Sequence, residues 1–317
     1  MAAYVLPFEK PVVDLVSRVR ELRELAQSDA HFEPELRRLE EKASRLAREL
    51  YADLTPWQKV QLSRHPSRPY TLDYVEHLFE DWQELHGDRR FGDDPAIVGG
   101  LARYRGRSVV VVGHQKGRST REKVTRNFGQ AHPEGNRKAS RLYDLAGRFG
   151  LPILTFIDTQ GAYPGIGAEE RGQSEAIGAC LASMARVPVP IVATIIGEGG
   201  SGGALALGVA NRVHVLEYGT YSVISPEGCA TILWKDGSKA DEAATRMKMT
   251  APDLLRLKVV DRIVEEPAGG AHQDVAATAR AIDAAIHEAL TALLRLTPKE
   301  LVRHRYDRFR SLGSFVA

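Results

Sequence analysis

The chain has 317 residues, with 43 Lys and Arg against 41 Asp and Glu, 43% hydrophobic residues and two cysteines. This composition is typical of a globular protein of about two domains of roughly 150 residues, and it excludes a disordered tail and a nucleic-acid binder held by bulk charge. Cys180 and Cys229 are too few for a disulfide framework or a four-ligand zinc site, so we expect a reducing compartment and no metal on this chain.

The N-terminus shows no secretion signal, and no stretch approaches the roughly 18 apolar residues that a membrane span needs. We therefore expect a cytoplasmic protein without a membrane contact. Residues 1–86 contain no glycine, whereas every glycine but Gly313 lies between Gly87 and Gly270. This shift predicts a boundary between about Tyr70 and Gly87 and divides the chain into an N-terminal helical segment, 1–75, and a turn-rich body, 76–317.

Within the first segment, Leu and Val recur at three- and four-residue steps over 12–25 and 36–50. This period predicts two amphipathic helices with a break near 28–34, a hairpin that packs on its own domain or on a partner subunit. From residue 96 onward, short β-branched runs alternate with helical stretches, which predicts an α/β domain. The expected strands cover 109–112, 153–157, 191–196 and 213–216; the expected helices cover 137–149, 169–185, 204–210, 242–249, 282–294 and 299–309, with a further helix that starts after Thr250.

One segment, 191–207, combines an expected strand, a run of five glycines within seven residues and a helix start. Gly197, Gly199 and Gly202 satisfy the dinucleotide-binding pattern G-x-G-x-x-G, and Glu217 lies about where a ribose-binding acid would stand. An NAD-dependent oxidoreductase is therefore one alternative. Against it, the motif lies two-thirds of the way along the chain, although the dinucleotide turn is normally the first βα turn.

The same segment satisfies the nucleophile-elbow pattern G-x-S-x-G, which would make Ser201 the nucleophile of a hydrolase. Asp261 with His272 or His287 could complete such a triad. A third interpretation uses the backbone: glycines at a helix start leave N–H groups without intrahelical partners, so Gly202 and Gly203 could form an oxyanion hole. Two more glycine-rich junctions, at 157–165 and 113–118, also follow strands, which favours one cleft lined by backbone amides.

Six runs of residues follow one another along the body: Arg68-Pro-Tyr-Thr-Leu-Asp-Tyr, Ile97-Val-Gly-Gly, Gly113-His-Gln-Lys-Gly-Arg, Gly161-Ala-Tyr-Pro-Gly-Ile-Gly-Ala-Glu-Glu-Arg-Gly-Gln, Gly197-Glu-Gly-Gly-Ser-Gly-Gly-Ala-Leu-Ala and Tyr221-Ser-Val-Ile-Ser-Pro-Glu-Gly-Cys-Ala. With Phe8-Glu-Lys-Pro and Glu266-Pro-Ala-Gly-Gly-Ala-His, they span nearly the whole chain. This order of motifs resembles the carboxyltransferase α subunit of bacterial acetyl-CoA carboxylase.

The resemblance implies a crotonase-like (ClpP/crotonase) spiral of ββα units with an N-terminal helical extension. It also implies a β subunit as partner, typically in an α2β2 heterotetramer, together with biotin carboxylase and a biotin carboxyl carrier protein. The implied reaction moves the carboxyl group of carboxybiotin, on that separate carrier, to acetyl-CoA and yields malonyl-CoA, the first committed step of fatty acid biosynthesis. Any structural zinc would lie on the β subunit.

The resemblance further implies that Gly202 and Gly203 bind the ureido oxygen of biotin through their backbone. Two preorganised donors at a developing oxyanion are worth several kcal/mol in comparable sites, and no strong side-chain base is then needed. One departure is Gln160, which stands where the family has proline, so the loop is expected to be less rigid. The remaining residues expected near biotin are Gly161, Ala162, Tyr163, Gly165, Glu198, Gly199, Gly200 and Ser201; Lys116, Arg118 and Arg126 are candidates for contact with coenzyme A or the carrier protein.

Overall fold

The structure is a computed structural model that describes residues 4–313. Positions 1–3 and 314–317, the outer ends of the two expected segments, lie outside the described residues. A mixed sheet of eight strands forms the centre, in the order β1-β2-β3-β4-β5-β6-β8, with β7 paired to β5. The strands are β1 (Glu80–Glu84), β2 (Ile97–Tyr104), β3 (Arg107–His114), β4 (Ile153–Thr159), β5 (Ile191–Gly200), β6 (Arg212–Leu216), β7 (Thr220–Ser222) and β8 (Arg262–Val264).

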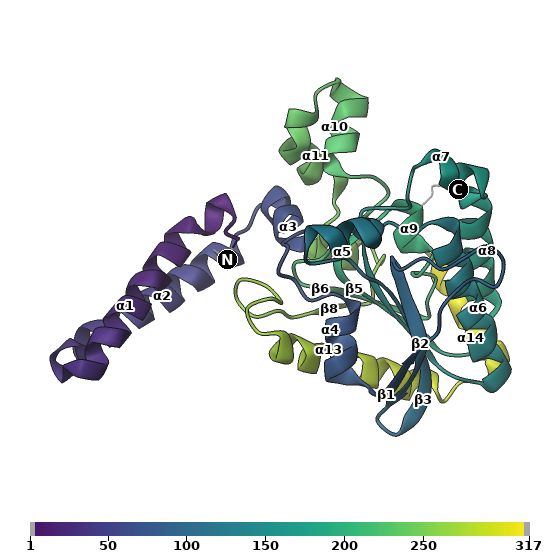
Figure 1. The fold of residues 1–317 in the computed structure, drawn as a ribbon, viewed down its shortest axis with the longest axis horizontal. Coiled ribbons are helices and arrows are strands. Elements are labelled where there is room, and N and C mark those ends of the chain that lie inside the picture. Colours follow the sequence, from purple (N-terminus) through teal and green to yellow (C-terminus); the bar gives the residue numbers. More distant parts are fainter. Residues whose placement is uncertain (1–3, 314–317) are drawn as a thin grey trace.

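Helices cover both faces of this sheet (Figure 1). They are α1 (Lys10–Ser28), α2 (Glu33–Ala52), α3 (Pro56–Ser63), α4 (Thr71–Leu78), α5 (Thr120–Thr125), α6 (Pro133–Phe149), α7 (Ile166–Glu170), α8 (Gln173–Arg186), α9 (Ser201–Leu205), α10 (Pro226–Trp234), α11 (Ala240–Met247), α12 (Ala251–Arg256), α13 (Val275–Leu293) and α14 (Pro298–Arg310). None of the helices within residues 4–313 has the length and apolar character needed to cross a membrane.

The run of four valines in β3 shows how the sheet divides its core between two faces. Val110 and Val112 pack with residues of α6 and α8, whereas Val109 and Val111 pack with residues of α4 and α13. Because successive side chains of a strand point to opposite faces, a strand buried on both faces needs an unbroken apolar run. Strands β3, β4, β5, β6 and β8 pair in parallel, so their carboxyl ends lie at one edge of the sheet.

Two helical pairs project from this body in Figure 1: the hairpin α1–α2, and α10–α11 above the carboxyl edge. The hairpin buries Leu15, Val19 and Ala43 between its own two helices. The hairpin and its break near residue 30 confirm the prediction from the three- and four-residue period. The expected division after residue 75 falls within α4, which packs on β2 and α13. The division into two units stays a prediction.

The four predicted strands are all present, and the helix after Thr250 begins at Ala251 as predicted. Two helix predictions were wrong. The expected helix 169–185 is divided between α7 and α8, because Gly172 adopts a left-handed φ of 78°. The expected helix 204–210 is instead α9, which begins at Ser201 and ends at Leu205, where tight turns take over. Strands β1, β2, β7 and β8 were not predicted, since three of them are short and the other contains two glycines.

Candidate functional site

A cavity of about 640 Å³ lies at the carboxyl edge of the sheet. One wall comes from the loop after β4, with Gln160, Gly161, Ala162 and Tyr163, and from Ser201 at the start of α9. The opposite wall comes from Arg64, after α3, and from the segment that enters α10, 223–227. In open α/β sheets ligands bind beyond the carboxyl ends of the parallel strands, so this cavity is the candidate site.

The glycine run that forms one wall is not the loop that we expected. Gly197–Gly200 continue strand β5, where Glu198, Gly199 and Gly200 pair with Thr220, Tyr221 and Ser222 of β7. Helix α9 follows at once, and Ser201 makes the turn with a φ of 54°, a left-handed conformation that is uncommon for serine. The change from strand to helix therefore occurs within one residue.

Close backbone approach explains why glycine is required on both sides of this turn. A Cβ atom on Gly200 would lie 2.1 Å from the Gln160 carbonyl oxygen, and one on Gly203 would lie 2.6 Å from the Gly161 carbonyl carbon and 2.8 Å from the Ala162 nitrogen. No acceptor within residues 4–313 hydrogen-bonds the N–H groups of Gly202 and Gly203, which stand in the first turn of α9. The turn thus brings unpaired amides against the peptide after β4.

The loop after β4 is built around the Thr159 hydroxyl, which donates to the Gly161 carbonyl at 2.8 Å and accepts from the Gly161 N–H at 3.1 Å. Tyr163 packs against the His132 ring, with the centroids 4.2 Å apart. At Gly165 a Cβ atom would lie 2.3 Å from the Tyr163 ring. Of the expected biotin contacts, Gly161, Ala162, Tyr163 and Ser201 line the cavity, whereas Gly199 and Gly200 form the strand behind it.

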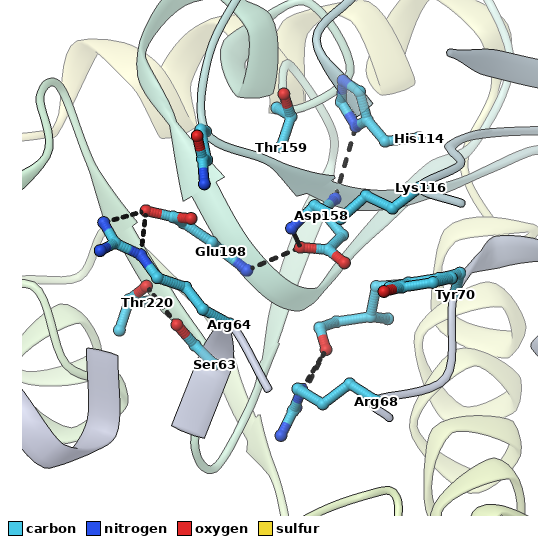
Figure 2. Close-up of polar contacts among 12 residues, drawn as sticks. Ser63, Arg64, Arg68, Tyr70, His114, Lys116, Asp158, Thr159, Glu198 and Thr220 are labelled. Atoms are coloured by element: carbon cyan, nitrogen blue, oxygen red, sulfur yellow. Dashed lines mark hydrogen bonds and ion pairs between the residues drawn. The ribbon is translucent and has the colours of Figure 1, made fainter. Parts of the chain in front are cut away.

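Glu198 is held from two directions, as Figure 2 shows. Its backbone N–H donates to Asp158 Oδ1 at 3.0 Å, and its carboxylate accepts from Arg64 at 2.6 Å. The Glu198 side chain is 5% exposed, and its Oε2 atom has no partner among the described residues. Sequence reasoning missed Arg64 because the residue that it binds lies 134 positions away.

The three basic candidates lie outside the lining of the cavity. Lys116 forms a largely buried ion pair with Asp158, with Nζ and Oδ1 2.6 Å apart. Arg118 pairs with Asp73 and lies over the Tyr70 ring. Arg126 donates to the Pro95 carbonyl at 2.7 Å. Each of these side chains therefore has an internal partner.

His114 and the cysteines are poor candidates for side-chain chemistry. Burial lowers the pKa of His114 to about 3, so its imidazole is neutral near pH 7. Its Nδ1 accepts a long hydrogen bond, 3.4 Å, from the Asp158 N–H. Burial raises the pKa of the Cys180 thiol to about 12, and Cys229 is half-buried. Within residues 4–313, no group of three or more His, Cys, Asp or Glu side chains is placed to hold a metal ion.

The geometry does not support the two alternatives, a dinucleotide-binding site and a hydrolase with Ser201 as nucleophile. A dinucleotide turn needs a glycine loop between strand and helix, but Gly197 and Gly199 belong to β5. For a hydrolase, Ser201 does stand at a strained strand-to-helix turn. However, Asp261 is bound to Arg308 and the Val213 N–H, and His272 stacks on His65. Among the described residues, no histidine hydrogen-bonds Ser201.

The α/β fold of this chain is also that of the solved structures that it resembles. A *Pseudomonas* malonate decarboxylase hetero-tetramer in complex with coenzyme A matches with a TM-score of 0.60 and 17% identity, over 76% of this chain and 94% of that one. The transcarboxylase 12S matches with a TM-score of 0.56 and 21% identity, over 71% of this chain and 42% of that one. These likenesses confirm the crotonase fold, the fold of carboxyltransferases.

The sequence comparisons go further than the fold. Residues 5–313 match the family model described as acetyl co-enzyme A carboxylase carboxyltransferase-like. The acetyl-coenzyme A carboxylase carboxyl transferase subunit alpha of *Sorangium cellulosum* is 72% identical over 316 residues, with 100% of both chains covered. The same subunit of *Thermus thermophilus* is 58% identical over 312 residues, with 98% of this chain and 99% of that one covered. The chain belongs to the family of acetyl-CoA carboxylase carboxyltransferase α subunits.

Proposed function

We propose that this chain is the α subunit of a carboxyltransferase that moves the carboxyl group of carboxybiotin to acetyl-CoA and yields malonyl-CoA for fatty acid biosynthesis. The observation that carries the proposal is the full-length match to named α subunits, 72% identical over 316 residues. The cavity is consistent with it, because its wall includes the loop after β4 and the start of α9 at Ser201, and no histidine within residues 4–313 lines it. Neither a dinucleotide turn nor a catalytic triad competes with this assignment.

The Gly202 and Gly203 N–H groups are proposed to donate to the ureido oxygen of biotin. Two facts support this role: these amides have no acceptor among the described residues, and they directly follow Ser201, which lines the cavity at the start of α9. Gly202 itself lines a second cavity, of about 610 Å³, and Gly203 is buried. Biotin supplies a ureido group whose oxygen gains negative charge when the carboxyl group leaves. Preorganised donors at a developing oxyanion stabilise the transition state more than the ground state.

The other residues expected near biotin are proposed to have two roles, as the wall of the cavity and as its support. Gly161, Ala162 and Tyr163 are proposed to form the wall beside the biotin ring, with Gly165 and Ser201 at its edges. Gly199, Gly200 and Glu198 are proposed to hold that wall in place from β5. Of the basic residues, Arg118 keeps 46% of its side chain exposed despite its ion pair. It is therefore a better candidate than Lys116 or Arg126 for contact with coenzyme A or the carrier protein.

The partners follow from the family. We propose that the chain works in the cytoplasm with a β subunit that carries any structural zinc, as an α2β2 heterotetramer served by biotin carboxylase and the biotin carboxyl carrier protein. An exposed apolar side chain at the cavity supports a covering subunit: Val223 lines the cavity and is 79% exposed. The projecting hairpin α1–α2 is proposed to pack on a partner subunit.

Reconstitution tests this proposal. The purified chain alone should show no carboxyl transfer, because half of the site is expected on the β subunit. Addition of the β subunit should give malonyl-CoA-dependent carboxylation of biocytin, measured in the reverse direction as acetyl-CoA release. Substantial turnover by the lone chain, or none by the assembled complex, would refute the proposed division of the active site.

A further inference from the structure

Arg64 is the only basic side chain that lines the candidate cavity in the described part of the chain. It follows the last residue of α3, and 22% of its side chain is exposed, toward the cavity that Gln160, Tyr163 and Ser201 also line. A guanidinium remains charged at all relevant pH values and presents a fork of donors that matches a carboxylate. Any anionic group that enters this cavity therefore has one cation to meet.

Two carboxylates now share that guanidinium. Glu198 Oε1 accepts from Nε at 2.9 Å and from Nη2 at 2.6 Å. Glu227 Oε1 accepts from Nη1 at 2.6 Å, and Glu227 Oε2 accepts from Nη2 at 3.3 Å. The contact with Glu227 thus uses both terminal nitrogens and both carboxylate oxygens, the arrangement of a bidentate carboxylate ligand.

The two partners differ in how firmly they are held. Glu198 lies on β5 with 5% of its side chain exposed, and its N–H is bound to Asp158. Glu227 lies in the first turn of α10, which projects from the body in Figure 1, and 42% of its side chain is exposed. The Arg64–Glu227 pair is partly buried, but water reaches the Glu227 carboxylate, and its solvation offsets part of the free energy gained from Arg64. Glu227 is therefore the partner that a ligand could replace.

The charges of this cluster also indicate that Glu227 is the replaceable partner. One guanidinium faces two carboxylates, so the cluster carries an excess of negative charge when both are ionised. Although partial burial raises the pKa of Glu227, the hydrogen bonds from Arg64 outweigh this effect and lower it below its usual range. Glu227 is thus ionised near pH 7, and its departure from Arg64 would leave a neutral Arg64–Glu198 pair with free donors toward the cavity.

A second arginine, four residues along the chain, shows what a purely structural role looks like. Arg68 is 1% exposed, and its partner Glu266 is 0% exposed. Its remaining donors bind the Ile196 carbonyl oxygen at 2.9 and 3.2 Å. Arg68 is closed to solvent and ligands, whereas Arg64 opens into the cavity.

We propose that Arg64 binds the carboxylate that is transferred, and that Glu227 occupies this position in the free chain and gives way when substrate enters. The inference rests on the proposed carboxyl transfer and adds the group that recognises its anionic end. The subsite for this carboxylate is formed by Nη1 and Nη2 of Arg64, which now bind Glu227. Glu198 holds the guanidinium from behind, and α10 carries the competing carboxylate.

The test compares two ligands that differ by this carboxylate. In the reconstituted complex, the KM for malonyl-CoA is measured with biocytin as acceptor, and acetyl-CoA is measured as a competitive inhibitor. Arg64→Gln should lower kcat/KM for malonyl-CoA about 10- to 100-fold, as expected for loss of charge-assisted hydrogen bonds. The inhibition constant of acetyl-CoA should stay within about twofold, and Arg64→Lys should recover part of the loss.

Glu227→Gln removes the competitor without disturbing a buried charge, so it remains informative if Arg64→Gln does not fold. It should lower the KM for malonyl-CoA by up to about fivefold. The control is Glu242→Gln, an exposed carboxylate on α11 that binds Arg246 and should change neither constant. An unchanged or higher KM in Glu227→Gln, or equal losses for malonyl-CoA and acetyl-CoA in Arg64→Gln, would overturn the proposal. Inactivity of the wild-type complex would count against the proposed function instead.

Discussion

His114 shows how a residue that attracts attention in the sequence can serve the fold rather than the chemistry. It ends β3 close to the cavity, yet it is 1% exposed, and Thr71 donates a hydrogen bond to its carbonyl oxygen at 2.5 Å. Burial disfavours the imidazolium form, which is why the pKa of His114 lies near 3. The neutral ring is part of the packing behind Asp158.

This burial predicts a pH dependence of stability. Between pH 6.5 and about 3 the unfolded chain binds a proton at His114 that the folded chain does not, so acidification through this range favours unfolding. From pH 7 to pH 5 the contribution is about 2 kcal/mol. His114→Asn, whose side-chain oxygen can still accept from Asp158, should lose less stability over that range than the wild type in urea titrations. Equal losses in the two proteins would contradict the assignment.

Arg64 marks the limit of sequence reasoning at the level of the single residue. Its partners Glu198 and Glu227 lie 134 and 163 positions away, so no local pattern distinguishes it from the many exposed arginines. The need for a glycine at position 203 could be predicted from the sequence, because five glycines in seven residues exceed what one turn requires. The difference is that glycine reports a local backbone constraint, whereas an ion pair depends on the tertiary fold.

Among the elements, β5 and α9 position the proposed site. The β-branched start of β5 predicted a strand, but its glycine end, Gly197–Gly200, gave no sign of a strand because glycine disfavours extended structure. Tertiary pairing with β4 and β7 overrides that preference. The same pairing places the helix start three residues earlier than expected, and so brings Gly202 and Gly203 into the first turn of α9.

Helix α8 offers a test of which glycines the fold requires. A Cβ atom on Gly178 would meet nothing within 4 Å, whereas Gly172 has a φ of 78°. Gly178→Ala should therefore stabilise the protein by about 0.5–1 kcal/mol, because alanine loses less backbone entropy in a helix. Gly172→Ala should destabilise it. Urea unfolding of both variants measures this contrast, and a destabilised Gly178→Ala would show that α8 packs more tightly than the structure indicates.

At the scale of the whole molecule, the chain combines a sheet whose core is buried with a cavity and a helical hairpin at its surface. The cavity is lined in part by an exposed Val223, and the hairpin α1–α2 extends away from the body. Composition predicted the helical front end and the turn-rich body, since glycine is absent before residue 87. It could not predict how far α4 reaches across the expected boundary, because that depends on contacts with β2 and α13.

The central claim is that backbone amides of this chain take part in the chemistry, and Gly203→Val tests it most directly. The added side chain would lie against Gly161 and Ala162, where a Cβ atom alone comes within 2.6 Å. In the complex with the β subunit, assembly should persist by analytical ultracentrifugation, as it should in Gly178→Ala. The rate of carboxyl transfer should fall about 10²- to 10³-fold, as for loss of an oxyanion-hole donor. Full activity in an assembled Gly203→Val complex would contradict the claim and leave the chain a scaffold for its partner.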